Sequence, residues 1–404
     1  MPMPPTAIIL GARFPALGII SSLSAEGIPC VVCETRRLQA AWSRRASFRR
    51  MPDPRSDPEG AAARVADIAR EVGRDGQVPV LIPTDDHFAQ LLATFSEQLA
   101  PVATICGAAS DAVALITDQL RFASWALERG LDVPRSVMAS AFECQLPFPI
   151  IVKPLNFSCF LALDAELPTG VRHSDLRFRK IESAEDWADF RARHAGILEH
   201  FVVQEFVPGS SEDMYSIGIY ADRTAAVRGI FVGRKLHGFP AAYGNTILGQ
   251  NDEVPDTLLD EVRWIVSQLG YNGIAEFEYR REPGSDRFRL IEVNPRAWSW
   301  IAATKASQAD IPLMAYQDLT GARIVDAVDN SDPGRIKAVR AFPDLINVLW
   351  RYRADAPDWV MSPLAWRRKL KARNLVVMEF NGFDPLVSLY CAALAIRDLI
   401  KNER

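Results

Sequence analysis

The first hundred residues alternate between short apolar runs and longer segments in which apolar residues recur at helical spacing. The apolar runs predict β-strands at 6–11, 28–34 and 78–84, and the helical pattern occurs at 15–27, 59–73 and 87–100. Alternating strands and helices are typical of a parallel sheet with crossover helices. We therefore predict a parallel α/β domain that ends near residue 108.

The pattern changes after residue 110. Residues 111–129 have the spacing of one amphipathic helix that ends at Gly130, and strand-like runs separated by Gly, Pro or Asp dominate from Phe148 onward. One helical segment, 255–270, interrupts these strands and ends at Gly270. This organisation indicates an α+β domain with a largely antiparallel sheet over residues 111–320.

The tail, residues 321–404, combines a basic segment, 366–374, with a helical segment, 384–402. Apolar residues at helical spacing in the latter are Leu386, Leu389, Tyr390, Ala393 and Ile396. A basic amphipathic helix can lie on a membrane surface. Packing against its own protein is the commoner case, so we expect a C-terminal helical extension.

Composition narrows the class of protein. The chain has 404 residues and a net charge of -4, so no basic field points to nucleic acid. No apolar run reaches the roughly 18 residues that span a bilayer, and no charged segment precedes the first apolar run as in a signal peptide. We expect a cytoplasmic protein without a transmembrane segment.

Cysteine and histidine give no sign of a metal site. The six cysteines are scattered in apolar surroundings, and we interpret them as reduced thiols. Cys30 and Cys33 have the odd spacing that places two residues on opposite faces of a strand. The five histidines are dispersed, without ligand-like spacing.

Two features of the first domain allow a functional alternative. Gly11 and Gly18 in the first turn do not match the glycine spacing of a dinucleotide site, although Glu34 stands where a ribose-binding acid would. We favour a structural role for this turn over a nicotinamide site. Seven arginines lie between Arg36 and Arg55; we favour a solvated loop, with an anion-binding loop at the carboxyl end of the sheet as the alternative.

Acidic residues gather on two strand-like segments of the second domain. Glu276 and Glu278 share one face of the first, and Glu292, Asn294 and Arg296 alternate along the second. Antiparallel pairing would bring Glu276 beside Glu292 and Asn294. Carboxylate and amide oxygens suit Mg²⁺, whose shell is usually completed by phosphate and water. The alternative is a surface hairpin with ion pairs.

Two upstream segments complete a nucleotide site. Lys153 ends an apolar strand, where its charge could meet a phosphate. Another strand ends on Gln204 and Glu205 before a turn at Pro208 and Gly209. Free backbone groups in such a linker could pair with the edge of adenine, and an acid shortly after it, such as Glu212, could bind ribose hydroxyls.

The order "IIVKP … VVQEFVPGSSE … GIAEFEY … LIEVNPR" resembles the ATP-grasp superfamily. Within it, "FVPGSSEDMYSIGIY", "GRKLHGFPAAYGNT" and "EVNPRAW" are most similar to D-aspartate-ligase-like and carbamoyl-phosphate-synthetase-like carboxylate–amine ligases. The resemblance implies a Rossmann-like pre-ATP-grasp domain at 1–110 and a two-subdomain ATP-grasp fold at 111–320, divided into 111–205 and 206–320. Residues 321–404 would follow as the helical extension.

The resemblance also implies roles for individual residues. Lys153 would contact the ATP phosphates, and Arg296 the transferred phosphoryl group; these two are the predicted catalytic residues. One or two Mg²⁺ ions, with Mn²⁺ as an alternative, would be held by Glu276, Glu292 and Asn294. The remaining nucleotide contacts would be Gln204, Glu205 and Val207 at adenine, Glu212 at ribose, and Arg234 and Lys235 as phosphate or carboxylate clamps.

Two departures from the family pattern stand out. Many members have an Asp-Lys pair before the first subdomain, where this chain has Asp118 followed by Gln119, with Arg121 as a substitute charge that would need a different reach. Many also have a glycine-rich lid, whereas the segment 155–170 contains only Gly170.

The predicted function is ATP-dependent joining of a small-molecule carboxylate to a small-molecule amine through an acyl phosphate, with release of ADP and phosphate. A non-catalytic ATP-binding module and a nicotinamide oxidoreductase are the alternatives. Many members of the superfamily dimerise, so a homodimer is also expected.

Overall fold

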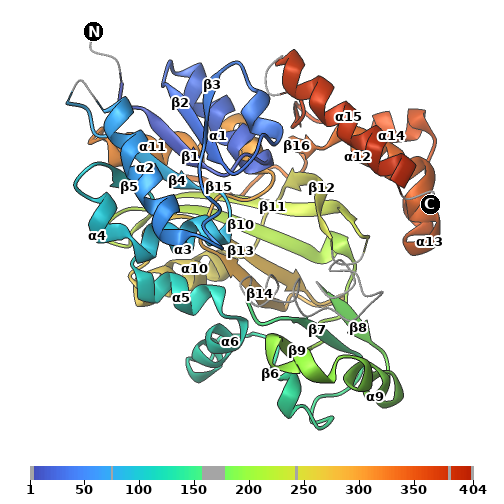
Figure 1. The fold of residues 1–404 in the computed structure, drawn as a ribbon. Coiled ribbons are helices and arrows are strands. Elements are labelled where there is room, and N and C mark those ends of the chain that lie inside the picture. The colour runs from blue at the N-terminus through green and yellow to red at the C-terminus, as the bar shows by residue number, and fades with distance from the viewer. Residues whose placement is uncertain (1–3, 74–75, 157–177, 242–243, 381–383, 402–404) are drawn as a thin grey trace.

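The computed structural model describes residues 4–73, 76–156, 178–241, 244–380 and 384–401, and the strands in these parts form three sheets (Figure 1). The first sheet has five parallel strands in the order β3-β2-β1-β4-β5. Its strands are Ala7–Leu10 (β1), Cys30–Glu34 (β2), Ala46–Arg50 (β3), Val80–Pro83 (β4) and Thr104–Ile105 (β5). The helices between them are Phe14–Ala25 (α1), Pro58–Val72 (α2), Asp86–Thr94 (α3) and Ser96–Leu99 (α4). The predicted parallel α/β alternation is confirmed.

The interpretation of residues 36–55 as a solvated loop is wrong in part. This segment contains a short 3₁₀ helix, Gln39–Trp42 (η1), and strand β3, which pairs in parallel with β2 from Cys30↔Ala46 to Glu34↔Arg50. The strand lies at the edge of the sheet, where backbone pairing does not require an apolar side-chain pattern. Its arginines therefore concealed it in the sequence.

Both glycines of the first turn are explained by packing. Gly11 has φ +105°, and a Cβ there would lie 2.1 Å from Thr84 Oγ1. A Cβ at Gly18 would lie 2.8 Å from the backbone nitrogen of Ala302. These close approaches account for the glycines without a dinucleotide, in agreement with the structural role that we favoured.

The predicted single helix over 111–129 is two helices, Ser110–Thr117 (α5) and Gln119–Glu128 (α6). Asp118 separates them, because its carboxylate accepts hydrogen bonds from the backbone N–H groups of Leu120 and Arg121 and so caps the second helix. The cap fixes Gln119 at the first position of α6.

The second sheet has four antiparallel strands in the order β6-β9-β7-β8. They are Ser136–Met138 (β6), Ile150–Pro154 (β7), Arg179–Ile181 (β8) and Phe201–Glu205 (β9). Helix Ala184–Arg193 (α9) contributes Trp187 and Phe190 to the core of this unit. The predicted lid segment 155–170 lies outside the described residues after Asn156.

The third sheet has eight strands in the order β14-β13-β10-β11-β12-β16-β17, with β15 beside β11. The strands that precede the tail are Met214–Ala221 (β10), Val227–Phe239 (β11), Asn245–Asn251 (β12), Gly273–Arg281 (β13) and Phe288–Asn294 (β14). They pair antiparallel, as predicted. Helix Asp256–Leu269 (α10) shares an apolar core with one face of this sheet and ends at Gly270 in the left-handed conformation.

The opposite face of the third sheet carries two tryptophans and a polar group. Trp298 lies against Gly218 of β10, and Trp300 lies against Gly233 of β11 and Gly249 of β12. Both indole rings are fully buried. They are therefore core residues, and they fix the chain directly after Arg296.

The tail is not purely helical. Strands Ala327–Asp329 (β15), Ile336–Val339 (β16) and Asn374–Val377 (β17) belong to the third sheet. Helix Ile311–Leu319 (α11) precedes the tail, and the helices within it are Ala341–Ile346 (α12), Tyr352–Asp355 (α13), Pro363–Lys369 (α14) and Pro385–Lys401 (α15). The division into domains stays a prediction.

Helix α15 packs on the protein, as favoured, but of the predicted stripe only Tyr390 is seen to take part. Val387 and Cys391 are buried in the same apolar cluster as the first sheet, whereas Leu386, Leu389 and Ile396 are exposed. Tyr390 stacks on Trp42 of η1. No helix within the described ranges is long and apolar enough to cross a membrane.

The cysteines largely follow the prediction. Cys30 and Cys33 lie in two different apolar clusters on opposite sides of the first sheet. Cys144 is exposed, which corrects the expectation of apolar surroundings for every cysteine. Cys159 lies outside the described residues.

Candidate active site

The centre of the candidate site is the face of β13 and β14 that lies opposite α10. Strand register places Glu276 across from Asn294 and Glu278 across from Glu292. The predicted antiparallel pairing of these strands is therefore confirmed. Glu278 belongs to this group although we did not assign it a role. Its spacing of two residues from Glu276 was the signal that could have found it.

Hydrogen bonds hold these side chains in place. Asn294 Nδ2 donates to Glu276 Oε2 and to Glu278 Oε1, each at 3.2 Å. Ser216 Oγ on the neighbouring strand β10 donates to Glu276 Oε1 at 2.8 Å. Gln119 Nε2 donates to Glu292 Oε1 at 2.8 Å. The carboxylates are thus oriented by neutral donors, with oxygen lone pairs left to bind a cation.

Glu276, Glu278 and Glu292 form the acidic group, and their negative charges are unfavourable when no cation neutralises them. Burial, and then the charge of Glu278, raise the pKa of Glu276 from its ordinary value of 4.5 to about 8. Burial also raises the pKa of Glu292, against the effect of Lys153. A divalent ion bound to such buried carboxylates would stabilise their charged forms.

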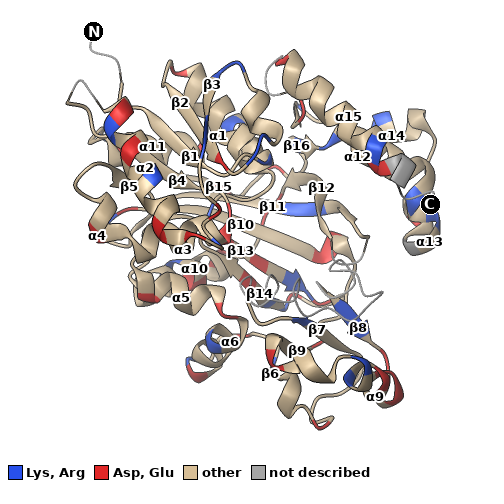
Figure 2. Cartoon of the chain, viewed as in Figure 1, with Lys and Arg blue, Asp and Glu red and all other residues tan. Residues whose placement is uncertain are grey.

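Two buried lysines from different sheets bring positive charge to the same group. Lys153 ends β7, and Lys235 lies on β11. Burial lowers the pKa of both lysines, while Glu278 and Glu292 act in the opposite direction on each. Lys235 Nζ donates to the carbonyl oxygen of Gly244 at 2.9 Å. Figure 2 shows acidic parts of β13 and β14 and basic parts of β7 and β11 in the same region of the molecule.

Arg296 connects this group to the first sheet. Its Nε donates to Asp86 Oδ1 at 3.0 Å, and its Nη2 donates to Asn294 Oδ1 at 2.9 Å. The distance from Nη1 to Glu276 Oε2 is 3.9 Å. Asp86 begins α3, directly after β4, so the carboxyl end of the parallel sheet reaches the site. Sequence reasoning missed Asp86, since nothing in its local pattern links it to a strand 200 residues away.

Arg234 is not part of this group. Successive residues of a strand point to opposite faces, so Arg234 and its neighbour Lys235 cannot both face the acidic residues. Arg234 Nε instead donates to Asp252 Oδ2 at 2.7 Å. Arg234 therefore lies outside the acidic group, and its role as a phosphate or carboxylate clamp stays a prediction.

The segment after β9 is held by two arginines that sequence reasoning missed. Arg289 Nη1 and Nη2 donate to Glu205 Oε1 and Oε2, each at 3.2 Å. Arg280 Nη1 donates to the carbonyl oxygens of Val207 and Gly209. Burial is the largest single effect on the Glu205 carboxyl and raises its pKa, but the hydrogen bonds and charges of Arg289 and Arg135 together outweigh it, so the pKa is lowered.

The remaining predicted contacts are partly engaged within the protein. The Gln204 side chain is buried and donates to Ser136 Oγ at 3.1 Å. Glu212 Oε1 accepts from Lys369 Nζ of α14 at 3.5 Å. A nucleotide in this segment would therefore meet side chains from the tail as well as from β9.

The donor set fits Mg²⁺ only if other ligands complete the shell. Within the described ranges, no three His, Cys, Asp or Glu side chains are placed to hold a metal ion together. Glu276, Glu292 and Asn294 nevertheless present oxygens of the type that Mg²⁺ binds, and Mg²⁺ commonly takes one or two carboxylates plus phosphate and water. The residues are compatible with an ion that arrives with a nucleotide.

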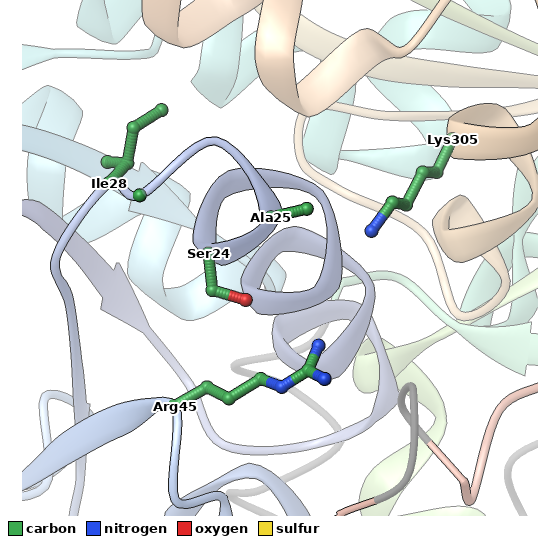
Figure 3. Close-up of a pocket in the computed structure, with 6 residues that line it drawn as sticks. Ser24, Ala25, Ile28, Arg45 and Lys305 are labelled. Carbon is green, nitrogen blue, oxygen red and sulfur yellow. The ribbon is translucent and has the colours of Figure 1, made fainter.

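A cavity of about 660 Å³ near the end of α1 has different chemistry (Figure 3). Ser24, Arg45 and Lys305 are among its lining residues, and Lys305 Nζ donates to the carbonyl oxygen of Ser21. None of its lining residues belongs to the acidic group on β13 and β14.

Comparison with known proteins gives a distant relative and several similar folds. No protein-family model matches the chain. D-aspartate ligase from Enterococcus faecium (strain Aus0004) is 23% identical over 230 residues, which are 54% of this chain and 53% of that protein. The chain thus spans about half the length of this curated relative.

Two solved structures cover most of the chain. N5-carboxyaminoimidazole synthetase from Staphylococcus aureus complexed with ADP has a TM-score of 0.62 at 12% identity, over 88% of this chain and 87% of that one. The biotin carboxylase domain of Hydrogenobacter thermophilus 2-oxoglutarate carboxylase, in complex with MgADP, ADP and bicarbonate, has a TM-score of 0.59 at 14% identity, over 80% and 72%. The chain therefore has the ATP-grasp fold that its motifs resemble.

Proposed function

We propose that this protein is an ATP-dependent ligase that joins a carboxylate to an amine. The observation that carries the proposal is the meeting of Glu276, Glu292 and Asn294 with Lys153 and Arg296, which come from two sheets. The likeness to D-aspartate ligase and to structures that hold ADP supports it.

The reaction has two steps. A carboxylate oxygen of the substrate attacks the γ-phosphorus of ATP, the bond from that phosphorus to ADP breaks, and an acyl phosphate forms. The amine nitrogen then attacks the acyl carbon, phosphate leaves, and the nitrogen loses a proton. Both steps need positioning and neutralisation of charge but no covalent nucleophile from the protein.

Each named residue has a task in this scheme. Lys153 and Lys235 place ammonium groups near the phosphates, where their burial strengthens the attraction. Arg296 presents a guanidinium fixed by Asp86 and Asn294, which suits an acyl phosphate. Glu276, Glu292 and Asn294 would hold Mg²⁺, or Mn²⁺, which neutralises phosphate charge when bound. The backbone of residues 205–207 would contact adenine, and Glu212 would bind ribose.

The same proposal includes the division of the chain into domains. The parallel five-stranded sheet corresponds to a Rossmann-like pre-ATP-grasp domain at 1–110, followed by subdomains at 111–205 and 206–320. In this scheme the tail completes the second subdomain, because β15, β16 and β17 join its sheet. A cytoplasmic homodimer is the expected state, and light scattering after gel filtration measures its mass.

The test is ADP release from MgATP over a panel of amino-acid pairs. We expect release to require one particular carboxylate and one amine, and Glu292→Gln to reduce it at least 100-fold. Glu253→Gln is the matched control, because Glu253 is exposed and outside the site. Full turnover by Glu292→Gln would contradict the assignment.

A non-catalytic ATP-binding module is the second candidate. The observation that favours it is Gln119, an amide in the place where many members of the superfamily have a lysine. Tight binding of MgATP without substrate-dependent ADP release over the whole panel would establish this alternative.

A further inference from the structure

A second cavity, of about 350 Å³, lies between the first sheet and the tail. The turn after β1 contributes Arg13 and Phe14, and the segment after β2 contributes Arg36. Arg340, directly after β16, and Glu379 contribute from the tail. None of the lining residues belongs to the acidic group on β13 and β14, so the cavity is separate from the candidate active site.

Basic side chains outnumber acidic ones in this cavity. Two of its five arginines are already committed: Arg397 pairs with Asp398 at 3.1 Å, and Arg37 donates to the carbonyl oxygen of Ala41 at 3.1 Å. Arg13, Arg36 and Arg340 form no ion pair with a carboxylate in the part of the chain that the structure describes. The cavity therefore has an excess of positive charge, because its five arginines face only two carboxylates, those of Glu379 and Asp398.

The buried atoms of the cavity also lack partners. Arg340 Nε is buried without a hydrogen-bond acceptor among the described residues, and its guanidinium lies 4.3 Å from the centre of the Phe14 ring. Glu379 Oε2 accepts from the backbone N–H of Ala341, but Oε1 has no partner in the same set of residues. Buried polar atoms normally have partners, so a bound group with both an acceptor and an O–H donor is the natural occupant.

The backbone adds to this attraction. Helix α1, with 12 residues, begins at Phe14 at the carboxyl end of β1, and no side chain caps the N–H groups of its first turn, in which Pro15 has none. Ligands of open parallel sheets bind at this end of the strands, and an uncapped helix N-terminus favours anions.

We propose that this cavity binds a small molecule through a dianionic phosphate group. Planar guanidinium groups match phosphate oxygens in pairs, and the two negative charges of a phosphate monoester or hydrogenphosphate offset most of the excess positive charge. A hydroxyl of the same ligand donates to Glu379. The volume is within the range of small-molecule sites and exceeds what phosphate alone needs, so it leaves room for an organic part.

The experiment is isothermal titration of the full chain with inorganic phosphate and, separately, with glycerol 3-phosphate, at ionic strength balanced with chloride. Arg13→Gln/Arg36→Gln is the informative variant, since both residues are exposed and the substitutions leave the fold intact. Arg340→Gln tests the buried contact. Arg223→Gln/Arg323→Gln is the control with the same change of charge at two other exposed arginines.

We expect saturable binding in the wild type and the control, and at least tenfold weaker binding in both cavity variants. Tighter binding of the ester than of phosphate identifies an organic phosphate as the ligand, and equal binding identifies free phosphate. Glu292→Gln retains this binding even if the ligase proposal fails. Absence of saturable binding, or binding that the cavity variants retain in full, overturns the inference.

Discussion

Gln119 Nε2 donates a hydrogen bond of 2.8 Å to Glu292 Oε1, and this contact joins the first residue of α6 to the end of β14. The amide stands where many members of the superfamily have a lysine. Gln119 nevertheless has a role at this position, because its amide orients Glu292, one of the proposed Mg²⁺ ligands.

Gln119→Leu should raise the Mg²⁺ concentration needed for ADP formation by roughly 10- to 100-fold, the usual loss of metal affinity when a partner that orients a metal ligand is removed. The measurement is the Mg²⁺ concentration at half-maximal rate with saturating ATP. Gln268→Leu, on the exposed face of α10, is the control. An unchanged Mg²⁺ requirement in Gln119→Leu would show that the contact does not position Glu292.

The raised pKa of Glu276 predicts how the stability of the protein without bound metal or nucleotide depends on pH. Its pKa is raised from 4.5 to about 8, so between these values the folded state holds a proton that the unfolded state has lost. The free energy of unfolding should therefore fall as pH rises from about 5 to 8, by on the order of a few kcal/mol from this group. Urea unfolding at pH 5, 6.5 and 8 measures it.

Glu276→Gln should remove most of that pH dependence, because the amide does not titrate. Glu253→Gln, at an exposed carboxylate, should leave it unchanged. An undiminished fall in Glu276→Gln would show that another group causes the dependence.

Arg289 should contribute to both stability and nucleotide affinity. Arg289→Met leaves the Glu205 carboxylate without its two-bond partner, which should cost about 1–3 kcal/mol in urea unfolding. The KM for ATP should rise as well, because Glu205 begins the linker proposed to bind adenine.

Arg287→Met is the matched control for Arg289→Met. Arg287 and Arg289 both pair with Asp132, but the Arg287 side chain is 53% exposed against 7% for Arg289. We expect a change within about 0.5 kcal/mol. Equal effects of the two substitutions would mean that burial of Arg289 carries no special weight.

The packing of Trp298 predicts that Gly218 does not tolerate a larger side chain. A Cβ at Gly218 would lie 2.1 Å from the Trp298 ring, so Gly218→Ala should destabilise the protein by about 1–3 kcal/mol. Thermal unfolding measures it. Gly196→Ala meets no atom within 4 Å and should not lower the midpoint. A Gly218→Ala variant of native stability would mean that the indole can move aside.

The sequence by itself determined the elements whose pattern is local. Strands such as β1 and β13 and helices such as α2 and α10 follow from apolar periodicity and terminal glycines, since those signals act within a few residues. Pairing of β13 with β14 also followed, because a short hairpin leaves few other registers. For this reason the sequence could place Glu276, Glu292 and Asn294 close together.

Only the tertiary structure decided contacts between segments far apart in the chain. Asp86 reaches Arg296, Gln119 reaches Glu292, and Arg289 reaches Glu205 across 84 to 210 residues, and no local pattern encodes such distances. Edge strand β3 escaped prediction because backbone pairing, not side-chain hydrophobicity, holds it. The sequence also could not show that neighbouring Arg234 and Lys235 meet different surroundings, Arg234 beside Asp252 and Lys235 near Glu278, because the two faces of the sheet exist only in the folded protein.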